Sequence, residues 1–108
     1  MSVHRNLLLA ERISGDIYLA KGDDETALKY YRDYLPDYTE YEERNRDLCF
    51  VLNNMARIFI KRNQTDSAVF YAKMALTSAG EYQDQQNIYD AAKLLSDLYE
   101  PGHSIHND

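Results

Sequence analysis

The sequence predicts an all-α protein built as a stack of antiparallel helix hairpins, with five helices. A pattern of small and aromatic residues that begins at Gly15 returns at Ala56, and in part at Ser96. We call the separation in sequence between Gly15 and Ala56 the repeat interval. Apolar residues recur at helical spacing, and glycine and proline are scarce, with 4 and 2 among 108 residues. Internal repetition with a period of about 20 to 50 residues is typical of stacked supersecondary units, so the repeat predicts the architecture.

The first hairpin is expected to join a helix over about residues 5–21 to a second helix that begins after Gly22. Glycine suits a left-handed helix end, and Asp23 or Asp24 can cap the next helix. The second helix is expected to end at Leu35, because the residue before a proline disfavours helical backbone. The residues expected on the buried faces recur at helical spacing: Ala10, Ile13, Ile17 and Tyr18, then Ala27, Tyr30, Tyr31 and Tyr34.

A third, long helix is expected from Thr39 to about residue 62, because Thr39 and Glu42 have the spacing of a capping box. Asn63 then turns the chain. Thr65 is the expected cap of a fourth helix over about residues 66–79, which Gly80 ends. The residues expected on the buried faces of these two helices are Leu48, Leu52, Met55 and Phe59, then Ala68, Tyr71, Ala72 and Ala75.

A fifth helix is expected to start near Tyr82 and to stop before Pro101, which leaves a flexible polar tail over residues 101–108. The residues on its expected buried side have the same spacing as those of the third helix. The single cysteine, Cys49, excludes an internal disulfide and a cysteine-based zinc site. We expect it to be a small buried apolar residue. The residues expected on the buried side of the fifth helix are Ile88, Ala92, Leu95 and Tyr99.

The repeated positions resemble the signature of the tetratricopeptide repeat (TPR) family. That signature has a small residue, an aromatic residue three later, Gly or Asn four after that, Ala five further on, and an aromatic residue beyond. The resemblance covers the chain up to about Glu100 and implies a right-handed superhelical stack of about two and a half repeats. The matching residues are Gly15, Tyr18, Gly22, Ala27 and Tyr31, then Ala56, Phe59, Asn63, Ala68 and Ala75, then Leu95, Ser96 and Tyr99.

The repeat departs from the family in its period, which is about 40 residues here and 34 in the family. Long repeats of this kind resemble those of bacterial signalling and regulatory proteins, including peptide-sensing regulators. An aromatic residue common early in the first helix of a repeat is replaced by Glu11, Leu52 and Ala92. We expect one domain over residues 1–100, with repeats over about 5–38 and 39–80 and a half repeat over about 81–100.

The charge of −6 and the pI near 4.9 argue against binding to nucleic acid or an anionic membrane, because both require a basic surface. The apolar run over residues 7–10 ends at Glu11 and is too short for a membrane span or a secretion signal. We therefore expect no direct membrane contact and favour a cytoplasmic location. An excised part of an exported or membrane-linked protein would have the same features.

In TPR arrays the first helix of each pair lines a concave groove, so the resemblance implies ligand contacts there. Some family members clamp a carboxylate with Lys and Asn one turn apart. Here Arg12 and Asp16 occupy those positions, and Asp16 would repel a carboxylate, so this clamp is not expected. The groove residues implied beyond the charged patch are Leu9, Asp16, Leu19, Phe50, Ile60 and Asp97. The patch itself, which suits a carboxylate or an acidic peptide, is Arg12, Asn53, Arg57, Lys61 and Lys93.

An alternative interpretation is that these charges are ordinary solvated helix surface. No nucleophile–base set or phosphate-binding loop occurs in the sequence, and His103 and His106 lack further rigid metal ligands. We therefore expect no enzyme activity, cofactor or metal. The predicted function is a protein- or peptide-binding module, an adaptor or the sensor portion of a larger signalling protein. The alternative is a structural module in which the fifth helix mediates homodimerisation.

Overall fold

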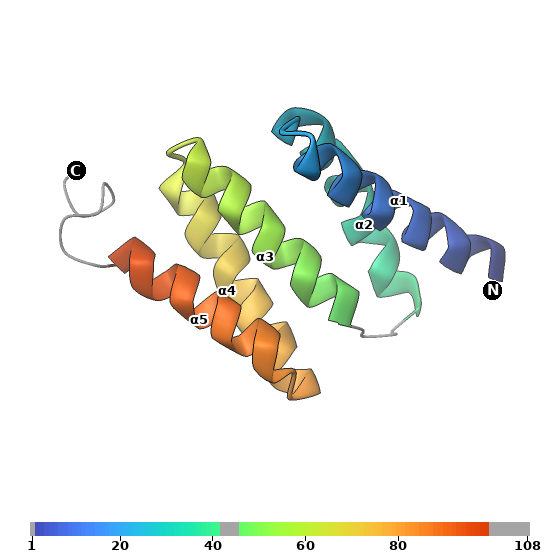
Figure 1. Ribbon diagram of the computed structural model, residues 1–108. Helices are drawn as coiled ribbons and strands as arrows, with labels where there is room; N and C mark the ends of the chain where they lie inside the picture. The colour runs from blue at the N-terminus through green and yellow to red at the C-terminus, as the bar shows by residue number, and fades with distance from the viewer. Residues whose placement is uncertain (1, 42–45, 100–108) are drawn as a thin grey trace. The chain divides into compact units, whose positions relative to one another are not determined.

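The computed structural model describes residues 2–41 and 46–99, which form five α-helices (Figure 1). Consecutive helices within each part pack as antiparallel neighbours, so the all-α, five-helix prediction is confirmed. The chain divides into two compact units, Met1–Arg44 and Asn45–Asp108. No helix in the described residues is long and apolar enough to span a membrane. The helices are α1 (Ser2–Ala20), α2 (Asp24–Tyr41), α3 (Arg46–Lys61), α4 (Thr65–Tyr82) and α5 (Gln85–Tyr99).

Three turns join helices with the same backbone geometry. Each has one residue with positive φ: Gly22 at 85°, Asn63 at 59° and Gln83 at 58°. The N–H of the next residue donates to a carbonyl five residues earlier, at 2.9 to 3.0 Å. This is the Schellman arrangement, which satisfies carbonyls at a helix end. The hydrogen bonds of the first two turns lie at positions separated by the repeat interval.

The residue after each left-handed position directly precedes the next helix, in the N-cap position. Asp23 accepts hydrogen bonds from the N–H and the hydroxyl of Thr26, and Asp84 accepts one from the N–H of Asn87. The predicted cap at Asp23 is therefore confirmed. At the middle turn the N-cap is Gln64, whose side chain makes no capping hydrogen bond. The prediction of Thr65 as this cap is wrong, because Thr65 is the first helical residue.

In the first unit, α1 and α2 pack against each other at Gly15. This glycine is buried, and the ring of Tyr31 lies where a Cβ would project from it. One turn further along α1, Tyr18 stacks on Tyr30 with ring centroids 5.8 Å apart. The predicted buried side of α2 is largely confirmed, because Ala27, Tyr31 and Tyr34 are buried and Tyr30 is half-buried.

The predicted buried side of α1 is wrong at three of its four residues. Ile13 and Ile17 are 41% and 48% exposed, and Ala10 is exposed as well. The side of α1 that faces α2 carries Gly15 and the fourth predicted residue, Tyr18. A glycine adds nothing to an apolar periodicity, yet its missing side chain allows the Tyr31 ring to pack against the helix backbone. Ring-to-backbone packing therefore sets the rotation of α1.

In the second unit, α3 is buried on almost every side, and the predicted core residues Leu48, Leu52 and Met55 are all buried. Phe59 stacks on Tyr71 of α4 with ring centroids 5.5 Å apart. Both rings follow those of the Tyr18–Tyr30 pair by the repeat interval. α4 contributes a stripe of fully buried small side chains, which confirms the prediction for this helix: Ala68, Ala72, Ala75 and Ala79.

Several predicted helix boundaries are wrong. α2 continues through Pro36 to Tyr41, although proline has no N–H for the carbonyl of Arg32. The predicted cap Thr39 therefore lies inside α2, while Glu42 lies outside the described residues. α3 accordingly starts at Arg46.

The end of α4 and the start of α5 also differ from the prediction. α4 passes Gly80 and ends at Tyr82, so the left-handed residue of this turn is Gln83. α5 then begins at Gln85. Its predicted buried side is wrong at Ala92 and Tyr99, which are exposed, whereas Ile88 and Leu95 are half-buried. The residues that α5 buries are Asn87, Ala91 and Leu98.

Candidate functional site

Buried amides and a carboxylate line the contact between α3 and α5. Asn53 on α3 is fully buried, and its Nδ2 lies 3.4 Å from both the carbonyl and the Oδ1 of Asn87. Asn87 in turn donates from Nδ2 to Asp84 at 2.8 Å. The Oδ1 of Asn53 is buried and accepts no hydrogen bond. The amide contacts of Asn53 and Asn87 join α3 to α5 at this point. The unsatisfied Oδ1 of Asn53 lowers the stability of this contact, because a buried acceptor without a hydrogen bond is costly.

Arg57 lies one turn beyond Asn53 and joins the same two helices at the surface. Its Nη1 donates to the Oδ1 of Asn54 at 3.0 Å, and its Nη2 lies 3.8 Å from Asp90 on α5. The arginine side chain is 41% exposed. The guanidinium is thus oriented by an amide and paired with a carboxylate beyond hydrogen-bond distance. We name the α3–α5 polar cluster by its residues: Asn53, Asn54, Arg57, Asp84, Asn87 and Asp90.

The other predicted patch residues also lie near carboxylates. Lys93 on α5 is 3.6 Å from Asp97, and both side chains are at least half exposed. Arg12 on α1 donates to Asp16 at 3.1 Å, and Asp16 also accepts a hydrogen bond from Tyr31. Arg12, Arg57 and Lys93 each therefore have an acidic neighbour, so none of these three cations forms a purely basic surface.

The structure brings only part of the predicted patch together. Asn53 and Arg57 lie in the cluster, and Lys61 is exposed on the same helix, one turn beyond Arg57. Asn53 is buried beneath the surface, so it supports the cluster and does not face a ligand. Arg12 lies in the first unit, on α1, and is not part of the α3–α5 polar cluster.

Cys49 lies one turn before Asn53 and has the predicted character, because it is fully buried with a free thiol. Burial raises the pKa of the thiol to about 11, and the charge of Asp84 adds to the shift. At neutral pH the thiol is protonated and a poor nucleophile. It is therefore a packing residue and not a reactive one.

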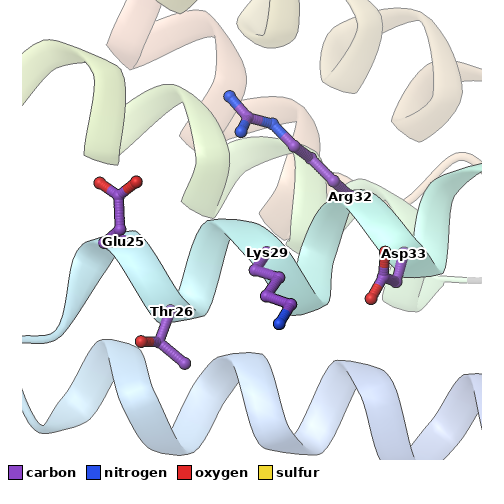
Figure 2. A pocket seen from close by; sticks show the side chains of 5 residues that line it. All are labelled: Glu25, Thr26, Lys29, Arg32 and Asp33. Atoms are coloured by element: carbon purple, nitrogen blue, oxygen red, sulfur yellow. The ribbon is translucent and has the colours of Figure 1, made fainter.

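A hollow of about 360 Å³ lies on the surface of α2 (Figure 2). Its lining contains no large apolar side chain that could receive an anchor, and opposite charges follow one another at helical spacing. This pattern is typical of a solvated helix surface. The five side chains that line the hollow are Glu25, Thr26, Lys29, Arg32 and Asp33.

The described residues contain no group of three or more His, Cys, Asp or Glu side chains that could hold a metal ion. His103 and His106 lie outside the described residues. Comparison with protein-family models, curated proteins and solved structures found no match.

Sequence reasoning missed the α5 half of the cluster. Asp84 and Asn87 have the i, i+3 spacing of an N-cap, which signals a helix start but not a contact with α3. Asp90 is a single acidic residue on a helix surface, and nothing in its local sequence indicates Arg57 as its partner. These residues meet only because the Gln83 turn sets α5 beside α3.

Proposed function

We propose that the chain is a non-catalytic, protein- or peptide-binding module of the TPR type, an adaptor or the sensor portion of a larger signalling or regulatory protein. Two features support the TPR assignment. The turns at Gly22 and Asn63 have matching hydrogen bonds, and the stacked pairs Tyr18–Tyr30 and Phe59–Tyr71 occupy matching places. Both correspondences keep the repeat interval that the sequence pattern has.

The observation that carries the proposal is the position of Arg57 at the exposed edge of the α3–α5 polar cluster. Asn54 orients the guanidinium, and Asp90 lies too far away, at 3.8 Å, to form a hydrogen bond with it. An incoming carboxylate can form the charge-assisted hydrogen bonds that Asp90 does not. Phe50 lies two turns earlier on α3, is 40% exposed, and offers an apolar contact nearby.

The partner that fits is a peptide segment with a carboxylate and, a few residues away, an apolar side chain. Because Asp90 and Asp97 lie beside the cations, a strongly acidic peptide would be repelled as well as attracted. We therefore expect a preference for segments with an isolated acidic residue. The proposed ligand is therefore a narrower class than the carboxylate or acidic peptide expected from the sequence.

Selection from a displayed peptide library tests this function. Enriched peptides should contain the acidic and apolar pair, and their affinity should fall at least about tenfold with Arg57→Glu. Lys73→Glu makes the same charge change on the exposed surface of α4 and should leave the affinity unchanged. Equal losses in both variants would mean that net charge, and not Arg57, governs binding.

The alternative function, self-association through the fifth helix, is favoured by one observation. α5 exposes Ala92 and Tyr99, the residues that periodicity assigned to its buried side. Sedimentation equilibrium of the full chain tests this alternative. A monomer at all concentrations would contradict it, whereas a dimer lost in Ala92→Glu would support it.

A further inference from the structure

The turn between α4 and α5 is made by residues that do not favour it. Its left-handed residue is Gln83, at φ 58°, and Asp84 follows it before α5 begins. The corresponding left-handed residues of the other two turns are Gly22 and Asn63. Glycine adopts this backbone without a steric cost, and asparagine adopts it more readily than most residues do. In glutamine the Cβ crowds the following carbonyl, so this turn is the most strained of the three.

The residues of this turn are also compatible with a continuous helix. Helical backbone at Gln83 would join α4 and α5 into one helix over residues 65–99, which contain no proline and one glycine, already helical at Gly80. In the turn, the N–H of Asp84 donates to the carbonyl of Ala79 at 3.0 Å. In a continuous helix it would donate to Gly80 instead, because helical hydrogen bonds reach the carbonyl four residues earlier. Straightening the turn therefore removes the left-handed backbone and keeps this donor paired.

α5 is attached to the rest of its unit by a small buried surface. The residues that it buries are Ala91, Leu98 and the polar Asn87. Its amide contact with Asn53 of α3 is long, at 3.4 Å, and the buried Oδ1 of Asn53 accepts no hydrogen bond. Few buried apolar groups and an unsatisfied acceptor lower the free energy of local opening. α5 is therefore the helix of this unit that detaches most easily.

We propose that two copies of this chain exchange their α5 helices. In each copy the turn at Gln83 straightens, α4 continues directly into α5, and α5 packs on α3 and α4 of the other copy. The receiving surface is the one that α5 occupies in the structure, so Asn53 of one copy contacts Asn87 of the second copy. The dimer keeps the contacts of the monomer and loses two strained turns, and a short strained hinge is a known cause of such exchange.

This inference rests on the self-association alternative and specifies how it occurs. Association through the exposed side of α5, which carries Ala92, leaves each α5 on its own chain. Exchange uses the buried side of α5 and the turn at Gln83. Substitutions at these two positions therefore separate the two modes of association.

Sedimentation equilibrium of the full chain, refolded from urea at low and at high protein concentration, measures the exchange. We expect a dimer after refolding at high concentration, because both copies are open when they meet. Gln83→Gly relieves the turn in the monomer by about tenfold at each of two hinges, so it should weaken the dimer about hundredfold. Asn63→Gly makes a similar change at the turn between α3 and α4, which exchange leaves intact. It should leave the dissociation constant unchanged, and so should Ala92→Glu.

A mixed dimer shows directly which copy supplies α5. Deuterated chain with protonated amides is refolded at high concentration with an equal amount of ordinary chain. The side-chain amide of Asn53 in the deuterated copy should then show a nuclear Overhauser effect to the aliphatic protons of Asn87. Only the ordinary copy has those protons, and they reach Asn53 only when α5 has been exchanged.

The outcomes separate exchange from self-association in general. A monomer at every concentration would overturn both. A dimer that is lost in Ala92→Glu and keeps its dissociation constant in Gln83→Gly would overturn exchange alone and assign the contact to the exposed side of α5. A mixed dimer without the effect between Asn53 and Asn87 would also contradict exchange.

Discussion

Gly15→Ala tests whether ring-to-backbone packing sets the arrangement of α1 and α2. A Cβ at this position would lie 2.5 Å from Cε1 and 2.7 Å from Cδ1 of Tyr31. The ring cannot move aside easily, because Tyr31 is fully buried and its hydroxyl donates to Asp16. The helices must therefore separate or the ring must leave its rotamer.

Two opposing effects set the size of the change. Overpacking a buried contact costs about 1–3 kcal/mol, and the distances at Gly15 favour the upper part of that range. Replacing a helical glycine by alanine contributes about 1 kcal/mol in the other direction. We expect a net loss of about 1–2 kcal/mol in the free energy of unfolding, measured by urea denaturation with far-UV circular dichroism.

The second hairpin supplies the matched control. At the positions that follow Gly15 and Tyr31 by the repeat interval it has Ala56 and Ala72, both fully buried, so this packing accepts an alanine pair. Tyr31→Ala alone should cost about 3–5 kcal/mol through the cavity that it leaves. In that background Gly15→Ala should become stabilising by about 0.5–1 kcal/mol, because the clash is gone and helix propensity remains.

A further control uses Gly80, which is also helical but where an added Cβ meets no atom within 4 Å. Gly80→Ala should stabilise the protein by about 0.5–1 kcal/mol. If Gly15→Ala were neutral, or cost the same with and without the Tyr31 ring, the packing argument would be refuted.

The turns and the core yield three more predictions. Gln64→Asp supplies the missing side-chain cap of α4 and should add about 0.5–1 kcal/mol in urea denaturation, and a similar gain in Gln64→Asn would separate capping from charge. Gln83→Gly removes a side chain from left-handed backbone at φ 58° and should raise stability by about 1 kcal/mol, whereas a loss would show that the side chain has another role. The pKa of Cys49 rises from 9.0 to about 11 on folding, so the unfolded state loses its proton first as pH rises. The stability of the parent chain should therefore fall relative to Cys49→Ala between about pH 9 and 11, and a parallel pair of stability curves there would contradict the shift.

Helix ends and caps could be predicted from the sequence where they depend only on a residue and its neighbours in the chain. The left-handed end at Gly22 and the cap at Asp23 follow from residue types that favour those conformations, and both are confirmed. The left-handed Gln83 was missed because glutamine has no preference for that backbone, whereas Gly80 does and is helical instead. At Gly80, the continuing helix overrides the local preference.

Packing across helices decided the features that sequence periodicity missed. Periodicity counts apolar side chains, so it assigned Ile13 and Ile17 to the core and could not weigh the space beside Gly15. The resemblance assigned Asn53 to the groove, but it is fully buried, and its amide contacts Asn87 from a distant part of the sequence. Arg57 on α3 was expected from the resemblance, but the carboxylate of Asp90 beside it depends on how α3 and α5 meet.

The Schellman turns also affect how the chain folds. Each turn reverses direction within two or three residues, so α1 meets α2, and α3 meets α4, with very short loops to close. Contacts between sequence neighbours form quickly, and helical proteins of low contact order fold in microseconds to milliseconds. We expect the pairs joined at Gly22 and Asn63 to form early and each on its own. A lesion in one pair, such as Gly15→Ala, should then slow the formation of that pair and leave the other at its original rate.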